Sequence, residues 1–172
     1  MDGFNYGGSL IRVLFTKSSK IGSSIIQWVT GEPVSHVAYE IDERIVFHSN
    51  FKGCHVEFRN SFLRSAEVVN SIKIEASLQT EERIYESISW ISGKPYDFKA
   101  LFYFAYCLMM KKCFGKPLPK RNLLNTNNSY FCVETWSALG PILNIAISDL
   151  DMTTPHQLYL SLKEQLCAVS NP

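Results

Sequence analysis

The chain opens with a series of short runs rich in β-branched and aromatic residues, each bounded by glycine, asparagine or charged residues. This pattern is typical of strands. The runs lie at 9–16, 35–41, 44–48, 54–58 and 68–74. Only Asp42 and Glu43 separate the second run from the third, which predicts a tight hairpin.

Longer segments carry apolar residues at helical spacing. They lie at 22–30, 80–92, 98–114, 130–139 and 155–166, and 60–66 is consistent with a turn or a short helix. We expect Trp28, Trp90 and Trp136, which lie within these patterns, to be core residues. Strands flanked by helices, with hairpins in place of regular βαβ alternation, indicate the α+β class.

The segment 98–114 is the most apolar of the chain. Its apolar run falls short of the roughly 20 residues that a membrane span needs, so it is predicted to be a buried or interfacial helix. Lys111, Lys112 and Lys116 follow at its end, where cations complement a helix dipole. Docking of this helix on a membrane is a less favoured interpretation of the same pattern.

Composition adds limits on domain count and partners. The 172 residues, of which 46% are hydrophobic and 19% charged, predict a single globular domain spanning 1–172. A net charge of +1 provides no field for holding a polyanion, so we expect no nucleic-acid partner. The first residues lack the features of a secretory signal, which predicts a cytoplasmic protein or one delivered within a larger particle. The five cysteines are odd in number and contain no C-x-x-C pair, which favours reduced thiols.

Three residues could together carry thiol chemistry. Cys132 lies where the sequence predicts a helix to begin, and a helix N-terminus favours the thiolate and can stabilise an oxyanion. His36 and His48 are an even number of residues apart, so across a hairpin they can face the same side of the sheet. A thiol nucleophile needs a base, and the base needs a partner that orients it. Taken alone, these residues are better explained as ordinary strand histidines and a small buried cysteine.

The order of several short motifs resembles a known family. Thr30-Gly31 leads to Ser35-His36-Val37, and Phe47-His48 follows on the next strand. The further matches are Gly93-Lys94-Pro95-Tyr96-Asp97, Tyr130-Phe131-Cys132-Val133-Glu134 and Thr154-Pro155 with Leu158. In this order they resemble the circularly permuted NlpC-type papain-like proteins, which include the YiiX-like and lecithin retinol acyltransferase groups.

The resemblance implies a permuted papain-like fold in which an antiparallel sheet packs against helices and the catalytic cysteine lies at a helix N-terminus. It implies a cysteine hydrolase that acts by thiol acyl transfer on an amide bond, a peptidase or amidase whose substrates include cell-wall peptides. Cys132 would be the nucleophile, His36 the base and His48 the residue that orients His36. The sequence departs from the family where Val133 replaces a serine and where His48 stands in place of the glutamate of many members.

Other interpretations remain open at this stage. The fold could serve as a non-catalytic binding or structural component of an assembly, or as a lipid-ester acyltransferase or hydrolase. We expect no cofactor and no metal. Zinc binding by His48, Cys54, His55 and Cys132 is disfavoured because Cys54 and His55 are adjacent on a strand and point to opposite faces. Glu134, Tyr96 and Asp97 are expected to fasten loops.

Overall fold

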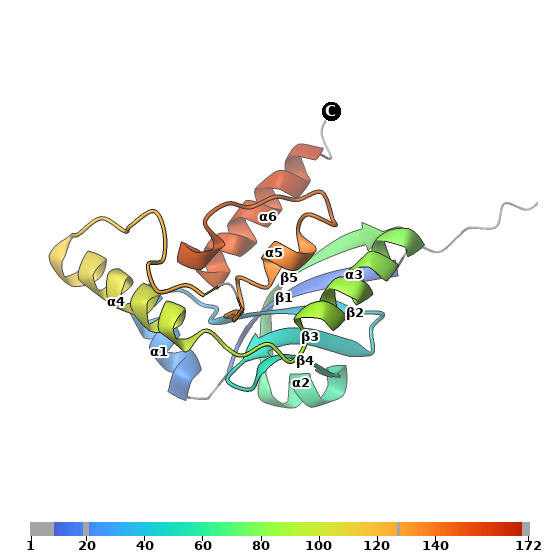
Figure 1. Ribbon diagram of the computed structural model, residues 1–172, viewed down its shortest axis with the longest axis horizontal. Coiled ribbons are helices and arrows are strands. Elements are labelled where there is room, and N and C mark those ends of the chain that lie inside the picture. The colour runs from blue at the N-terminus through green and yellow to red at the C-terminus, as the bar shows by residue number, and fades with distance from the viewer. Residues whose placement is uncertain (1–8, 19–20, 127, 170–172) are drawn as a thin grey trace, which may run out of the picture.

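The computed structural model describes residues 9–18, 21–126 and 128–169 (Figure 1). Its five strands form an antiparallel sheet in the order β4-β3-β2-β1-β5. The strands are β1 (Ser9–Lys17), β2 (His36–Ile41), β3 (Ile45–Asn50), β4 (Gly53–Phe58) and β5 (Glu67–Ala76). The predicted strands and the α+β class are therefore confirmed.

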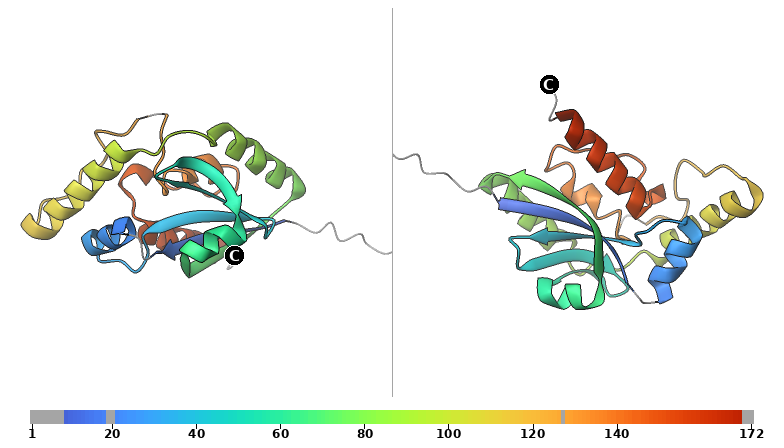
Figure 2. Two further views of the ribbon diagram at one scale, coloured as in Figure 1. Left: turned by 90° about the horizontal axis from the view of Figure 1, so that it is seen from below. Right: turned by 180° about the vertical axis from the view of Figure 1, so that it is seen from behind.

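The helices lie around this sheet. They are α1 (Ile21–Thr30), α2 (Arg59–Ser65), α3 (Leu78–Ile91), α4 (Phe98–Phe114), α5 (Trp136–Leu139), the 3-10 helix η1 (Leu150–Met152) and α6 (Pro155–Val169). Helix α2 lies on one side of the sheet, and α5 and α6 lie on the opposite side (Figure 1). Helix α4 extends away from the sheet beside α1 (Figure 2).

Alternation along the strands divides the sheet into two unlike faces. The main core contains Val37, Tyr39 and Phe47 from the sheet together with residues of α3, α5 and α6. The intervening residues, among them Ala38 and Val46, pack with Phe62 of α2 in a small second cluster. Hence, among the described residues, the same strands contribute a closed apolar face and a second face on which the short helix α2 packs.

The turn between β3 and β4 sets the register of the site. It consists of Phe51 and Lys52, and it places His55 directly opposite His48. Gly53 follows with φ of 92°, and a Cβ at this position would collide with the carbonyl oxygen of Lys94. The Cys54 N–H donates a hydrogen bond of 2.9 Å to that same oxygen. Glycine at 53 therefore allows the segment that precedes α4 to lie against β4.

Helix α4 has the predicted bounds but is only partly buried. Asp97 caps its N-terminus, accepting a hydrogen bond from the Ala100 N–H, and Gly115 ends it in a left-handed conformation. Ala100, Phe104 and Cys107 are its buried residues, whereas Phe98 and Phe102 are exposed. Within the described residues, no helix is long and apolar enough to cross a membrane.

Two sequence predictions are corrected. Trp28 and Trp90 are 66% and 69% exposed, and only Trp136, at 1%, is a core residue. The segment that contains Cys132 begins as consecutive turns, and its α-helix starts only at Trp136. Hydrogen bonds such as those from the Trp136 N–H to the Val133 oxygen and from the Ser137 N–H to the Glu134 oxygen close these turns. Such three-residue spacing gives tighter turns than an α-helix.

Candidate functional site

The two predicted histidines are in contact. Nε2 of His36, the first residue of β2, lies 3.0 Å from Nδ1 of His48 on β3. Their rings are nearly perpendicular, and both lie against the ring of Phe62 in α2. Their location on one side of the sheet confirms what the even spacing predicted.

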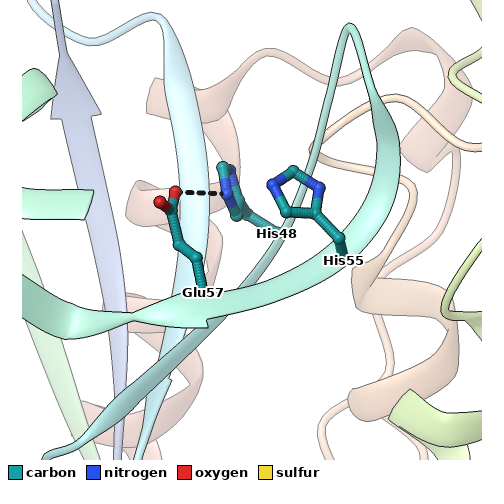
Figure 3. A group of neighbouring side chains, drawn as sticks. All are labelled: His48, His55 and Glu57. Atoms are coloured by element: carbon teal, nitrogen blue, oxygen red, sulfur yellow. Dashed lines mark ion pairs between the residues drawn. The ribbon is translucent and has the colours of Figure 1, made fainter. Parts of the chain in front are cut away.

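A carboxylate stands behind His48. Oε1 of Glu57, on β4, lies 2.9 Å from Nε2 of His48 (Figure 3). Because the negative carboxylate favours a proton on the facing nitrogen, this ion-pair contact favours the tautomer of His48 with its proton on Nε2. Nδ1 of His48 can then accept a hydrogen bond from the protonated Nε2 of His36. With these two contacts in place, the proton of His36 is on Nε2, and Nδ1 of His36 is the basic nitrogen.

His55 is a third histidine at this position. Its ring centroid lies 4.4 Å from that of His48, and its Nδ1 lies 2.9 Å from the carbonyl oxygen of Gly53. That oxygen accepts only, so Nδ1 of His55 carries the proton and Nε2 keeps its lone pair. Cys54 lies in the main core, so the structure separates the adjacent Cys54 and His55 as the strand pattern predicted.

A pocket of about 300 Å³ opens over these side chains. His36, His48, His55 and Glu57 line it, with Phe62 beneath them. Phe51 and Tyr96 line it from the loops at the end of the sheet. The histidines predicted from the sequence are therefore within reach of a ligand.

Cys132 belongs to the main core and is 4% exposed. Its loop is fixed by the Tyr130 N–H, which donates to the Pro95 oxygen, and by the Ser49 hydroxyl, which donates to the Tyr130 oxygen. The thiol reaches β2 at Val37, whose backbone N–H is hydrogen-bonded to it. Val37 directly follows His36 on β2, but strand alternation directs their side chains to opposite faces of the sheet. Cys132 lies in the main core and is not among the residues that line the pocket of His36 and His48, so the structure brings the two histidines together without placing the thiol in their pocket.

The environment of Cys132 corrects the expectation of a thiolate. Burial raises the pKa of the Cys132 thiol to about 11, although backbone hydrogen bonds from Val37 and Val133 act in the opposite direction. The four-residue helix α5 begins after Cys132 and not at it. The thiol is consequently neutral near pH 7.

Tyr96 connects this core position with the pocket. It lines the pocket and also belongs to the core cluster that contains Cys132. Burial raises the pKa of the Tyr96 phenol well above its usual value, and Cys132 contributes electrostatically to the increase. Tyr96 therefore belongs both to the pocket lining and to the core cluster of the thiol.

Asp97 fastens the loop that leads to Cys132, as predicted. One carboxylate oxygen accepts from the Ala100 N–H, and the other accepts from Thr126 and from the Ser129 hydroxyl. Burial by itself would raise the pKa of Asp97, but these hydrogen bonds outweigh it and lower the pKa.

Glu134 also holds this loop. Its Oε2 accepts from the Phe131 N–H at 3.0 Å, and its Oε1 accepts from the Asn125 amide at 2.6 Å. Burial raises the pKa of Glu134 to about 8 despite these bonds. Glu134 positions the backbone beside Cys132, in agreement with the role expected for it.

The sequence analysis missed His55 and Glu57 as partners of His48. The signal was present in the two-residue turn at Phe51 and Lys52, because that turn fixes which residues of β4 lie opposite β3. Strand alternation then places His55 and Glu57 on the face of His48.

Comparison of the chain with protein-family models, with curated proteins and with solved structures found no match in any of the three. The geometry of the site therefore carries the functional argument.

Proposed function

We propose that the protein is a cysteine hydrolase that cleaves an amide bond by thiol acyl transfer. The observation that carries the proposal is the contact of 3.0 Å between His36 and His48, in a pocket whose strand β2 also meets the Cys132 thiol at the next residue, Val37. The permuted papain-like fold is part of the same proposal.

In this mechanism His36 acts as the general base and His48 orients it. The mechanism requires the Cys132 side chain, which lies in the main core at rest, to become accessible to His36 in the substrate complex. Nδ1 of His36 takes the proton of the Cys132 thiol while the sulfur attacks the amide carbonyl carbon. The C–N bond breaks, His36 returns the proton to the departing amine, and a thioester remains. Water, deprotonated by His36, then releases the acid and regenerates the thiol. The backbone N–H of Cys132 is the proposed donor to the oxyanion.

A resting thiol with a pKa of about 11 requires activation in the substrate complex. Proton transfer to His36 therefore accompanies attack, and a stored thiolate has no part in the mechanism. The Glu57 carboxylate, 2.9 Å from His48, would stabilise positive charge that develops on the histidine pair. It supplies, through His48, the charge that a glutamate at position 48 would supply directly.

Turnover of peptide amides by the purified chain tests the proposal. Cys113 and Cys167 are exposed, so replacing both with serine gives a background free of their reactivity. In this background Cys132→Ala should abolish hydrolysis and labelling by a peptidyl electrophile, and His36→Ala should lower kcat/KM by about 10²–10⁴-fold. Cys107→Ala is the matched control and should keep both the hydrolysis and the labelling. Full activity of the folded Cys132→Ala variant contradicts the proposal.

His48 has a test of its own. His48→Asn can still accept a hydrogen bond from His36 and should retain more activity than His48→Ala. Equal activity of the parent and both folded variants would remove His48 from the mechanism.

A lipid ester is the second candidate substrate, and the surface beside the pocket favours it. Phe51 lines the pocket and stacks on Phe98 of α4 with ring centroids 5.6 Å apart. Phe98, Phe102 and Tyr106 continue an exposed apolar stripe along α4. Faster Cys132-dependent cleavage of vesicle-bound esters than of peptide amides would select this substrate class.

A further inference from the structure

A cluster of metal-ligating side chains lies on the second face of the sheet. His48, His55 and Glu57 each offer one ligand atom, and these atoms all lie within 4.8 Å of one another. His48 and His55 are directly opposed on β3 and β4, and Glu57 is two residues beyond His55 on the same face (Figure 3). We propose that these three residues bind a divalent transition metal of the zinc type.

The donor set selects the class of metal. Two imidazole nitrogens and one carboxylate oxygen suit Zn²⁺, whereas Mg²⁺ and Ca²⁺ prefer oxygen ligands. Zinc needs ligand atoms about 3.3–3.5 Å apart in a tetrahedral site. Glu57 is only partly buried, so its side chain can rotate to adjust its distances to the two histidines. All three residues line the pocket, which leaves a fourth position open to water or a ligand.

Hydrogen bonds already orient the rings for metal binding. Nδ1 of His55 donates to the Gly53 oxygen, which directs the lone pair of Nε2 away from that contact. Nδ1 of His48 faces Nε2 of His36 at 3.0 Å, so Nε2 is the nitrogen of His48 that faces Glu57. Ligand histidines in metal sites are held in this way through their second ring nitrogen.

Metal binding would reverse the hydrogen bond between the histidines. A metal on Nε2 of His48 moves the proton of that ring to Nδ1, which then donates to Nε2 of His36. The proton of His36 moves in turn to its Nδ1, the nitrogen assigned above as the base, and no net proton is released. Zinc therefore inhibits the hydrolase; this consequence, unlike metal binding itself, rests on the proposed function.

Calorimetric titration with Zn²⁺ tests the site directly. The full chain carrying Cys113→Ser and Cys167→Ser is used, so that exposed thiols do not bind the metal. We expect one Zn²⁺ per chain, with a higher melting temperature in its presence. His55→Ala and Glu57→Gln should each weaken binding by more than about 10-fold, and Mg²⁺ should not compete.

His156→Ala is the matched control, because His156 lies on α6, away from the cluster. It should bind Zn²⁺ like the background protein. Absence of binding in the background protein, or undiminished binding by folded His55→Ala, overturns the proposal. Co²⁺ supplies a second readout, since ligation by nitrogen and oxygen gives no sulfur-to-cobalt charge-transfer band, and a strong band of that kind would also overturn it.

The titration separates this inference from the proposed function. Metal binding measured by heat and by melting temperature needs no turnover. His55→Ala leaves the contacts among His36, His48 and Glu57 in place, so any hydrolysis that this variant performs should no longer be inhibited by Zn²⁺. Zinc binding without hydrolysis in the background protein would retain the metal site and reject the enzyme.

Discussion

The two faces of the central sheet use the same strands for different purposes. One face is apolar and closed, with Val37, Tyr39 and Phe47 packed beneath α3, α5 and α6. The other carries ionisable groups, and α2 covers only part of it with Phe62. Alternation along β2 and β3 therefore lets a single stretch of sequence both stabilise the fold and line the pocket with ionisable side chains.

The buried ionisable residues of the second face have partners of opposite charge or hydrogen-bonding neighbours. Glu40 is buried there, and it pairs with Arg12 of β1 and with Arg59 of α2. His48 is buried as well and has Glu57 and His36 at its two nitrogens. A buried charge without a partner would be strongly destabilising, and the partners of Glu40 and His48 remove that cost.

The largest expected effect on stability comes from the closed face. Trp136 is 1% exposed and stacks on Tyr39 with ring centroids 6.0 Å apart. Trp136→Ala should lower the free energy of unfolding by about 3–5 kcal/mol, because the neighbouring residues cannot fill the cavity. Urea unfolding of the variant and the parent measures the difference, and a loss under 1 kcal/mol would contradict the packing described for this face.

The open face should respond less to the same kind of change. Phe62→Ala removes a buried ring from a small cluster that borders the pocket, where solvent and side chains can occupy the space. We expect a loss of about 2 kcal/mol, below the usual range for buried Phe. The same urea experiment measures it, and a loss equal to that of Trp136→Ala would remove the energetic distinction between the faces.

Glu134 tests the effect of burial on a charged group, because burial raises its pKa to about 8. Between about pH 4.5 and 8 the folded state keeps a proton that the unfolded chain releases, so this group makes stability fall as the pH rises. Each pH unit should cost about 1 kcal/mol relative to Glu134→Gln, which does not titrate. Parallel pH profiles of unfolding for the two proteins would show that burial does not shift this carboxyl.

The smallest expected effect comes from a tryptophan that belongs to neither face. Trp90 is 69% exposed, and the ammonium of Lys94 lies 3.3 Å from its ring centroid. Trp90→Ala removes this cation–π contact and should cost about 0.5–1 kcal/mol. Thermal unfolding beside Trp136→Ala compares the two positions, and similar losses would show that burial does not decide the contribution of these tryptophans.

The sequence alone determined the strands, the bounds of α4 and the alignment of His36 with His48. These features depend on local rules: strand alternation has a period of two, and a short turn fixes hairpin register. The same rules could have predicted that His55 and Glu57 lie beside His48, because the turn at Phe51 and Lys52 pairs β4 with β3.

Tertiary structure decided what local pattern cannot specify. Helical spacing predicted three core tryptophans, but neighbouring elements cover only Trp136. A helix start near Cys132 predicted a thiolate, yet α5 begins only at Trp136 and burial raises the pKa of the thiol to about 11. Burial and electrostatics sum contributions from segments distant in sequence, so the protonation state of the Cys132 thiol is decided only when the chain is folded.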